Sequence, residues 1–238
     1  MTDIQKLINT VEEADSASKL LDAVEELAAA KSPASTPNLI AALSYNNPGA
    51  AVAAVDGLIG IGKPAVKPLL ELIDAHNYTA RAWAIRALAG IGDPRGLETL
   101  LDAADNDFAL SVRRAAARGL GTVLWDEMVP EGVKAAQIKV LDVLMRVCKD
   151  PEWVVRYAAV SGLENLAQST FNTYVELVLE VDKYFLELLE TEENLTVQSR
   201  IKLALQRLQQ LTIERELKSN SQSEEEEKEK SHRGGGRR

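Results

Sequence analysis

The chain has few of the residues that form disulfides and metal sites, and it has no long apolar run. Its 238 residues include one cysteine, Cys148, and two histidines, so an internal disulfide is excluded and a zinc site is not expected. No apolar run approaches the roughly 18 residues of a membrane helix, and the N-terminus has no basic segment followed by an apolar one. We therefore expect a protein of the reducing cytosol, without a signal peptide or membrane insertion.

Aromatic residues and surplus positive charge are also scarce. Aromatics make up 5% of the chain although 46% of it is apolar, which predicts a core of alanine, leucine and valine of the kind that closely packed helices form. The net charge is −9 and the pI is near 4.9. A general nucleic-acid-binding protein usually has the opposite charge balance, so we expect no nucleic-acid partner.

What the chain does contain is a recurring segment. Residues 81–95 have counterparts at 53–64, 112–121 and 155–164. Self-similarity at a spacing of about 30–45 residues indicates stacked helix pairs, so we predict an all-α solenoid. Solenoids present a long curved surface to a large partner, and they seldom hold a compact catalytic triad.

The predicted organisation has three parts. Residues 1–35 form an N-terminal helical cap, residues 36–217 a solenoid of about five helix pairs, and residues 218–238 a disordered charged tail without apolar residues to bury. Prolines mark predicted helix starts and glycines mark predicted ends, as at Pro37, Pro48, Pro64, Pro94, Gly62 and Gly92. The predicted helices cover residues 3–14, 17–30, 37–45, 48–61, 64–75, 78–91, 94–104, 109–122, 133–148, 151–168, 171–191 and 195–217.

Three arginines, Arg81, Arg113 and Arg156, stand near the start of the repeated helix. This pattern resembles the HEAT-like repeat, in which an aspartate closes one repeat and an arginine opens the following inner helix. An arginine that pairs with the aspartate or the backbone of its neighbour needs no ligand. A stacking ladder is therefore one interpretation of these arginines, and contact with a ligand is the alternative.

The run from Asp74 to Arg95 narrows the family further. Together with residues 97–104, 111–121 and 150–160, it resembles the E/F-type phycobilin lyases of cyanobacteria and red algae, and the F-type subunits in particular; the resemblance covers about residues 35–215. It implies a subunit of a heterodimeric phycocyanobilin lyase. With an E-type partner, such a lyase attaches phycocyanobilin through a thioether to a cysteine of the apo-phycocyanin α chain. The bilin is then a bound substrate, and no cofactor is required.

One departure from the family bears on the reaction. A related F-type subunit, which also isomerises the bilin, carries a His-Cys pair in a short motif. Here His76 is followed by Asn77 and Tyr78. The absence of a cysteine at this point favours lyase activity without isomerisation.

The implied reaction needs groups that hold two propionates, cover the apolar faces of the bilin and move a proton. Arginine pairs with carboxylates, aromatic rings suit the conjugated plane, and histidine titrates near neutrality. A carboxylate near the pyrrole N–H groups would favour the cationic, more electrophilic bilin. We predict His76 and Asp93 as catalytic residues. The residues predicted to bind bilin or the partner are Tyr78, Arg81, Trp83, Arg86, Arg114, Arg118, Trp153, Arg156 and Tyr157.

Structural interpretations stand beside several of these predictions. Trp83 could fill the core and Asp93 could end a repeat, while Cys148 is expected to be a buried small hydrophobe instead of the site of a transient bilin adduct. For the whole chain, two rival functions stay open. One is a HEAT-like phycobilisome disassembly protein that binds phycobiliprotein without lyase activity, and the other is a scaffold with no bilin contact.

Overall fold

The computed structural model describes residues 2–74 and 78–234, with the surroundings of side chains for residues 2–73 and 80–215. Within these residues the chain forms twelve α-helices, three short 3-10 helices and no strand. The α-helices are α1 (Asp3–Glu12), α2 (Ala17–Ala29), α3 (Thr36–Ala42), α4 (Pro48–Ile61), α5 (Lys63–Asp74), α6 (Tyr78–Ile91), α7 (Leu97–Asn106), α8 (Leu110–Leu120), α9 (Pro130–Val147), α10 (Trp153–Thr170), α11 (Val175–Thr191) and α12 (Leu195–Gly234). The 3-10 helices are η1 (Pro33–Ser35), η2 (Pro94–Gly96) and η3 (Trp125–Glu127).

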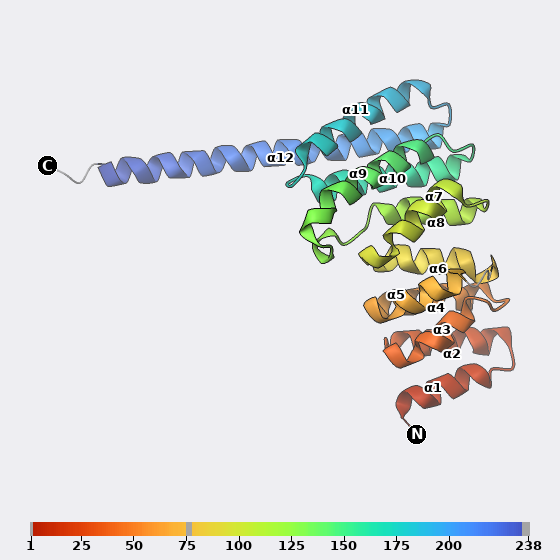
Figure 1. Ribbon diagram of the computed structural model, residues 1–238. Coiled ribbons are helices and arrows are strands. Elements are labelled where there is room, and N and C mark those ends of the chain that lie inside the picture. The colour runs from red at the N-terminus through yellow and green to blue at the C-terminus, as the bar shows by residue number, and fades with distance from the viewer. Residues whose placement is uncertain (1, 75–77, 235–238) are drawn as a thin grey trace.

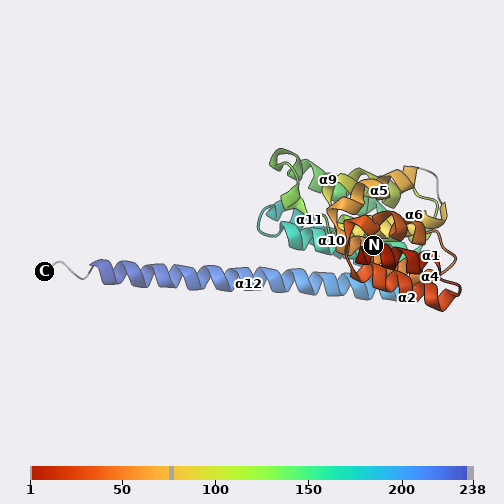
Figure 2. The same ribbon diagram turned by 90° about the horizontal axis from the view of Figure 1, so that it is seen from below.

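The helices form two stacked rows (Figure 1). In the row that we call inner, α2, α4, α6, α8, α10 and α12 each pack against the next one. The other six helices alternate with them and form the outer row. Figure 2 looks along the stack and separates α5 and α9 of the outer row from α2 and α12 of the inner row. This arrangement is an α-solenoid and confirms the predicted fold class.

Small residues allow the inner helices to lie close together. Gly119 of α8 faces Ala89 of α6, and a Cβ atom at position 119 would overlap the Cβ of Ala89. Alanines and leucines fill the layers between helix pairs, as the buried Ala84 and Leu88 do in α6. Because the layers are thin and dense, a larger residue at these positions would force the helices apart.

The helices begin and end at residues with a local physical reason. Gly62 and Gly92 end α4 and α6 with φ angles of 73° and 70°, in the left-handed region that glycine adopts readily. Pro48 opens α4 directly after Asn47, whose side chain accepts a hydrogen bond of 3.2 Å from the backbone N–H of Ala50. Both helices have the bounds that the sequence predicts.

Several other helix starts differ from the prediction. Helix α9 begins at Pro130 instead of residue 133, because this proline occupies a first turn where its missing N–H costs nothing. Helix α10 begins at Trp153 instead of residue 151, since the Asp150 carboxylate first accepts a hydrogen bond of 2.8 Å from the backbone N–H of Glu152. The predicted start at Pro94 belongs to η2, with α7 following it, and α11 begins at Val175, four residues later than predicted.

The last helix runs past the predicted end of the solenoid. Helix α12 continues to Gly234, and Figure 1 shows its distal part extending away from the two rows. The predicted boundary at residue 217 therefore falls inside one continuous helix. A polar helix that packs on nothing is only marginally stable in water. Disorder of the charged tail in solution thus stays a prediction, as do the limits of the N-terminal cap.

Candidate functional site

An ion-pair ladder runs along the turns that lead into the inner helices. Arg81 pairs with Asp107, Arg113 with Asp150, and Arg156 with Glu192, at 2.8, 2.7 and 2.7 Å between nitrogen and oxygen. The rungs are joined through the backbone: Arg113 also donates to the carbonyl of Asp107 (2.9 Å) and Arg156 to the carbonyl of Asp150 (2.9 Å). The stacking interpretation of these three arginines is therefore the one that their contacts support.

The ladder changes the part assigned to two predicted site residues. Arg81 and Arg156 are predicted to bind bilin or the partner, but both guanidinium groups lie against a buried carboxylate of the following repeat. The Arg156 guanidinium donates through Nε, Nη1 and Nη2 and has few donors left for a propionate. We therefore assign Arg156 to holding the repeats in register, and we propose the same part for Arg81 because it holds the equivalent place in its repeat.

The ion pair between Arg156 and Glu192 predicts that the stability of the protein depends on pH. The hydrogen bonds from Arg156 hold the pKa of the buried Glu192 carboxyl below its ordinary value, which is about 4.3. A carboxyl with a lowered folded-state pKa stabilises the protein above that ordinary value and loses this contribution as the pH falls through the folded-state pKa. The melting temperature should therefore change little between about pH 8 and 5 and fall below about pH 4.

The matched variant for this prediction is Glu192→Gln, which has no carboxyl to titrate. Melting curves of both proteins between pH 3 and pH 8 should show a smaller decline in the variant at acid pH, together with a lower melting temperature at neutral pH. An identical acid decline in both proteins would show that Glu192 contributes nothing to it.

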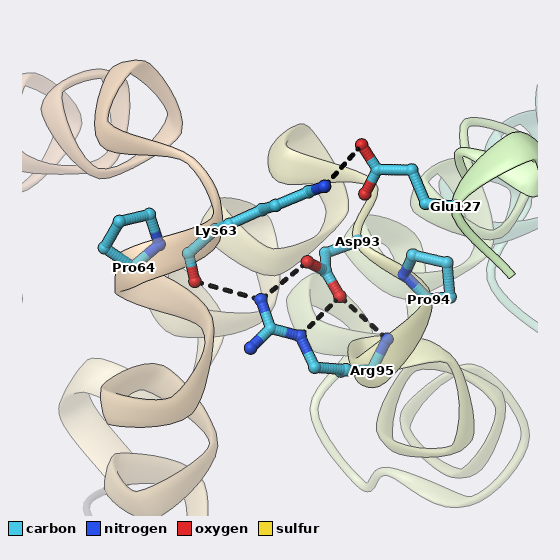
Figure 3. A pocket seen from close by; sticks show the side chains of 6 residues that line it. All are labelled: Lys63, Pro64, Asp93, Pro94, Arg95 and Glu127. Atoms are coloured by element: carbon cyan, nitrogen blue, oxygen red, sulfur yellow. Dashed lines mark hydrogen bonds and ion pairs between the residues drawn. The ribbon is translucent and has the colours of Figure 1, made fainter.

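Asp93, predicted as catalytic, lies in a hollow of about 470 Å³ lined by Lys63, Pro64, Asp93, Pro94, Arg95 and Glu127 (Figure 3). Its buried carboxylate accepts hydrogen bonds from the backbone N–H of Arg95 (2.9 Å) and from Nε and Nη2 of the same arginine (2.9 and 2.7 Å). The Arg95 guanidinium holds the pKa of Asp93 below its ordinary value.

Through these contacts Asp93 caps the start of η2, shortly after the end of α6. Arg95 also donates to the backbone carbonyl of Lys63 (3.0 Å), and Lys63 pairs with Glu127 at 3.1 Å. The charges around the hollow therefore neutralise one another. These contacts favour the alternative that Asp93 ends a repeat, and its catalytic role stays a prediction.

Three other arginines project from the inner row. Arg86 of α6 and Arg114 and Arg118 of α8 are exposed, and the ion pairs found among the described side chains include none of them. We call these three residues the basic patch. In a chain with a net charge of −9, neighbouring arginines that form no ion pair with the described side chains favour an anionic ligand or partner.

The basic patch has a defined extent along the stack. Arg86 and Arg118 hold equivalent places, each five residues after a ladder arginine, on two helices that pack together. The equivalent residue is Asp56 on α4 and Ser161 on α10. At this position of the repeat, α6 and α8 carry an arginine, and α4 and α10 do not.

Aromatic side chains border the basic patch. Trp83 is partly buried against the core, and the guanidinium carbon of Arg86 lies 5.8 Å from the centre of its ring, within the range of a cation–π contact. Trp153 and Tyr157 lie one turn apart on α10, and 43% and 38% of their respective surfaces are exposed. Outside the ion-pair ladder, α6, α8 and α10 therefore carry six of the residues predicted to bind bilin or the partner: Trp83, Arg86, Arg114, Arg118, Trp153 and Tyr157.

Two predicted residues cannot be placed from the structure. His76 lies outside the described residues, and Tyr78 is described only as the first residue of α6. The catalytic role of His76 and the binding role of Tyr78 stay predictions.

A buried ionic cluster joins α10 to α12. The Glu164 carboxylate accepts hydrogen bonds from Arg200, Arg207 and Gln168. Arg200 also donates to the Ser161 hydroxyl (2.9 Å), and its guanidinium carbon lies 5.9 Å from the centre of the Tyr157 ring. These contacts hold α10, with its exposed Tyr157, in place against α12. The sequence signal for it is Glu164, a charged residue between the apolar Leu163 and Leu166.

The comparisons with known proteins agree with the solenoid fold. The HEAT repeats family matches residues 36–121 and 66–164. The chain is 55% identical over 223 residues to the phycocyanobilin lyase subunit beta of Pseudanabaena tenuis (strain PCC 7409), with 93% of this chain and 78% of that relative covered. The chain belongs to the family of phycocyanobilin lyase beta subunits. It is also 59% identical over 166 residues to the phycocyanin alpha phycocyanobilin lyase CpcF of Synechocystis sp. (strain ATCC 27184 / PCC 6803 / Kazusa), with 70% of this chain and 78% of that relative covered.

A solved structure of the same family shares the fold. It comes from the complex of CpcE and CpcF of phycocyanin lyase from Nostoc sp. PCC7120, and the match has a TM-score of 0.66 and 43% identity over 72% of this chain and 98% of that chain. In the described part of this lyase-family chain, no helix is long and apolar enough to cross a membrane. The same residues contain no group of three or more His, Cys, Asp or Glu that could hold a metal ion.

Proposed function

We propose that this chain is the F-type half of a heterodimeric phycocyanobilin lyase, and that it works with an E-type subunit to attach phycocyanobilin to a cysteine of the phycocyanin α chain. The observation that carries the proposal is the match to phycocyanobilin lyase subunits over most of the chain. The basic patch and its aromatic border support it, because they offer charge for propionates and rings for a conjugated plane. Action in the cyanobacterial cytosol, with no cofactor beyond the bilin substrate, belongs to the same proposal.

The reaction joins a thiol to a carbon–carbon double bond. The thiolate sulfur of the acceptor cysteine bonds to the ethylidene carbon on ring A, the electron pair of that double bond moves into the tetrapyrrole, and a proton then adds to ring A. The net change is the addition of S–H across the double bond. Since the nucleophile belongs to the acceptor protein, the lyase supplies orientation, which can contribute roughly 7–11 kcal/mol in favourable cases.

Cys148 illustrates why the lyase chain itself does not act as the nucleophile. Its side chain is buried at the end of α9, and this burial raises the pKa of the thiol. A buried, protonated thiol is a poor nucleophile.

Cys148→Ala should accordingly leave bilin transfer within about twofold of the wild type, with a loss of stability of about 1 kcal/mol from the small cavity. The measurement is covalent bilin on the denatured α chain, with melting curves in parallel. Bilin found covalently on the denatured wild-type lyase chain, and missing from the variant, would instead identify Cys148 as the site of an adduct.

We assign the remaining tasks of the lyase to individual residues, most of them on the inner row. Arg86, Arg114 and Arg118 would pair with the two propionates, and Trp83 and Tyr157 would lie against the flat face of the bilin. His76 is the proposed residue for proton transfer, since an unperturbed imidazole titrates near neutral pH. Asp93 is left out of this scheme because Arg95 occupies its carboxylate.

The two rival functions differ from the lyase in what they bind and form. A disassembly protein would bind the assembled antenna without an E-type subunit and attach no chromophore. A scaffold would ignore bilin altogether. The family match favours the lyase over both.

The decisive experiment is co-expression of this chain with an E-type subunit, the phycocyanin α chain and a supply of phycocyanobilin. Covalent bilin is scored by absorbance of the denatured α chain. Covalent colour that requires both subunits supports the proposal. No colour beside a working control lyase, or equal colour without this chain, contradicts it.

A further inference from the structure

Helix α11 exposes a stripe of apolar side chains on the outer row. Val175, Leu179 and Leu186 are 38%, 64% and 53% exposed, and Leu189 is only partly buried. Together with Asp182, these residues follow one another at intervals of four, three, four and three positions along α11. Alternating intervals of three and four place side chains on one face of a helix, as in helices that pack along one another. We call Val175, Leu179, Asp182, Leu186 and Leu189 the α11 stripe.

The preceding outer helix, α9, is built in the same register. Apart from Leu141, every buried residue of α9 has a buried counterpart 41 positions later in α11 (177 − 136). The residues of α9 are Ala136, Gln137, Val140, Val143, Leu144 and Val147, and their counterparts are Leu177, Val178, Val181, Tyr184, Phe185 and Leu188. The α11 stripe can therefore be compared, position by position, with the corresponding face of α9.

That face of α9 is covered by α11 itself. Leu141, in the place of Asp182, is 3% exposed, and Met145, in the place of Leu186, is partly buried against the core. Helix α11 packs on α9, and the Tyr184 hydroxyl donates a hydrogen bond of 2.7 Å to the backbone carbonyl of Met145. Among the described elements only α12, which belongs to the inner row, follows α11. The α11 stripe is therefore a helix-stacking face that lacks its next outer helix.

The charges beside the α11 stripe lie on one side of it. The residues directly before its last four members are buried, namely Val178, Val181, Phe185 and Leu188. The residues directly after its five members are exposed, namely Glu176, Glu180, Lys183, Glu187 and Glu190. Burial raises the pKa of the Asp182 carboxyl, and no cation among the described side chains pairs with it, because Lys183 pairs with Glu187 at 3.8 Å. The open side of the stripe is thus acidic.

We propose that the α11 stripe is the docking surface for an amphipathic helix with a basic flank, supplied by another polypeptide. The apolar side of that helix would cover Leu179 and Leu186, its lysines or arginines would face the glutamates, and one cation would pair with Asp182. Terminal repeats of solenoids usually have a polar outer face, and apolar anchors beside complementary charge are typical of surfaces that receive a helix. The stripe is roughly 21 Å long, which corresponds to about four helical turns. This inference does not depend on the lyase function or on where bilin binds.

The charges also argue against the chain itself as the occupant. If α11 of a second copy lay on the stripe, glutamates of one chain would face glutamates of the other, and like charges in contact oppose association. The C-terminal segment of the same chain is directed elsewhere, since the distal part of α12 extends away from the two rows (Figure 1). A basic helix of a different polypeptide satisfies both the apolar and the acidic part of the surface.

The first test uses two synthetic peptides of about three heptads, with leucine at the a and d positions. They differ only in one flank, which is lysine in the basic peptide and glutamate in the acidic peptide. Binding to the full chain is measured by fluorescence anisotropy at physiological ionic strength. The basic peptide should bind at least about tenfold more tightly than the acidic one. Leu179→Ser with Leu186→Ser should weaken it at least about tenfold, whereas Leu110→Ser with Leu195→Ser, exposed leucines of the inner row, should stay within about twofold of the wild type.

A charge reversal tests the acidic side separately. Glu180→Lys with Glu187→Lys should make the chain prefer the acidic peptide, because the flanks of peptide and helix again carry opposite charge. The matched control is Glu12→Lys with Glu25→Lys, which makes the same change in net charge on exposed residues of α1 and α2. This control should keep the preference for the basic peptide.

Melting curves of all variants show whether a loss of binding reflects unfolding. If the leucine variant is destabilised, the charge reversal decides, because its two side chains are exposed. Equal binding of the two peptides by the wild type, or an equal loss in both leucine variants, would overturn the inference. A wild-type dimer in light scattering that Leu179→Ser with Leu186→Ser dissociates would instead assign the α11 stripe to a second copy of the chain.

Discussion

Replacing Arg86 and Arg118 together with alanine should lower the rate of bilin transfer by about a hundredfold or more, because each lost charge-assisted hydrogen bond costs about 1.5–3 kcal/mol. Both side chains are exposed on the inner row, outside the ion-pair ladder. Their removal leaves no buried carboxylate unpaired, so the melting temperature should hardly change. The rate is measured as covalent bilin on the denatured phycocyanin α chain in a purified reconstitution with the E-type subunit.

Two further variants make this result specific. Arg86→Lys with Arg118→Lys should recover part of the activity, since lysine keeps the charge but not the paired hydrogen bonds of the guanidinium. Arg146→Ala is the control for loss of an exposed arginine, because Arg146 lies on α9 in the outer row and pairs with Asp105 at 2.7 Å. Equal transfer by the wild type and the double alanine variant would remove the basic patch from the site.

The fold could be predicted closely because its signals are local. Pro48, Gly62 and Gly92 each act within a turn of the helix that they begin or end, and both bounds of α4 and the end of α6 follow directly from them. The start of α9 was harder to predict because Pro130 lies inside a non-repeating insertion, where the repeat gives no guide. The predicted end of α12 depends on whether a polar helix persists without packing, and hydrophobic periodicity does not determine that.

The candidate site was less predictable, because the role of an arginine depends on whether a carboxylate of another repeat faces it in the structure. Arg113 and Arg114 are adjacent in the sequence, yet Arg113 pairs with Asp150 in the next repeat and Arg114 is exposed. The carboxylates that occupy Arg81 and Arg156 lie in turns 26 and 36 residues away (107 − 81 and 192 − 156). Likewise Asp93 has the residue type of an acid–base group, but only the structure shows that Arg95 folds back onto it.

Arg113→Ala should therefore be strongly damaging to the stability of the chain, and Arg114→Ala should be mild. Arg113 donates two hydrogen bonds to the carboxylate of Asp150, at 2.7 and 3.2 Å, and two to the carbonyls of Asp107 and Phe108, at 2.9 and 3.1 Å. Without it the Asp150 carboxylate, 8% exposed, stays buried without its charge partner. Breaking a buried pair in this way costs about 3–5 kcal/mol, which lowers the melting temperature by roughly 6–20 °C at this size.

A comparison of Arg113→Ala with Arg114→Ala separates effects on stability from effects on bilin transfer. Arg114→Ala should leave the melting temperature within about 1–2 °C of the wild type, because an exposed substitution away from structural contacts changes stability by less than about 0.5 kcal/mol. It should still lower bilin transfer, since Arg114 belongs to the basic patch. Arg113→Ala should lower the melting temperature, and below that temperature its transfer rate should stay closer to the wild type than that of Arg114→Ala. The reverse pattern, with a stable Arg113→Ala protein that transfers no bilin, would show that Arg113 binds substrate and that the ladder is not what holds α8 against α10.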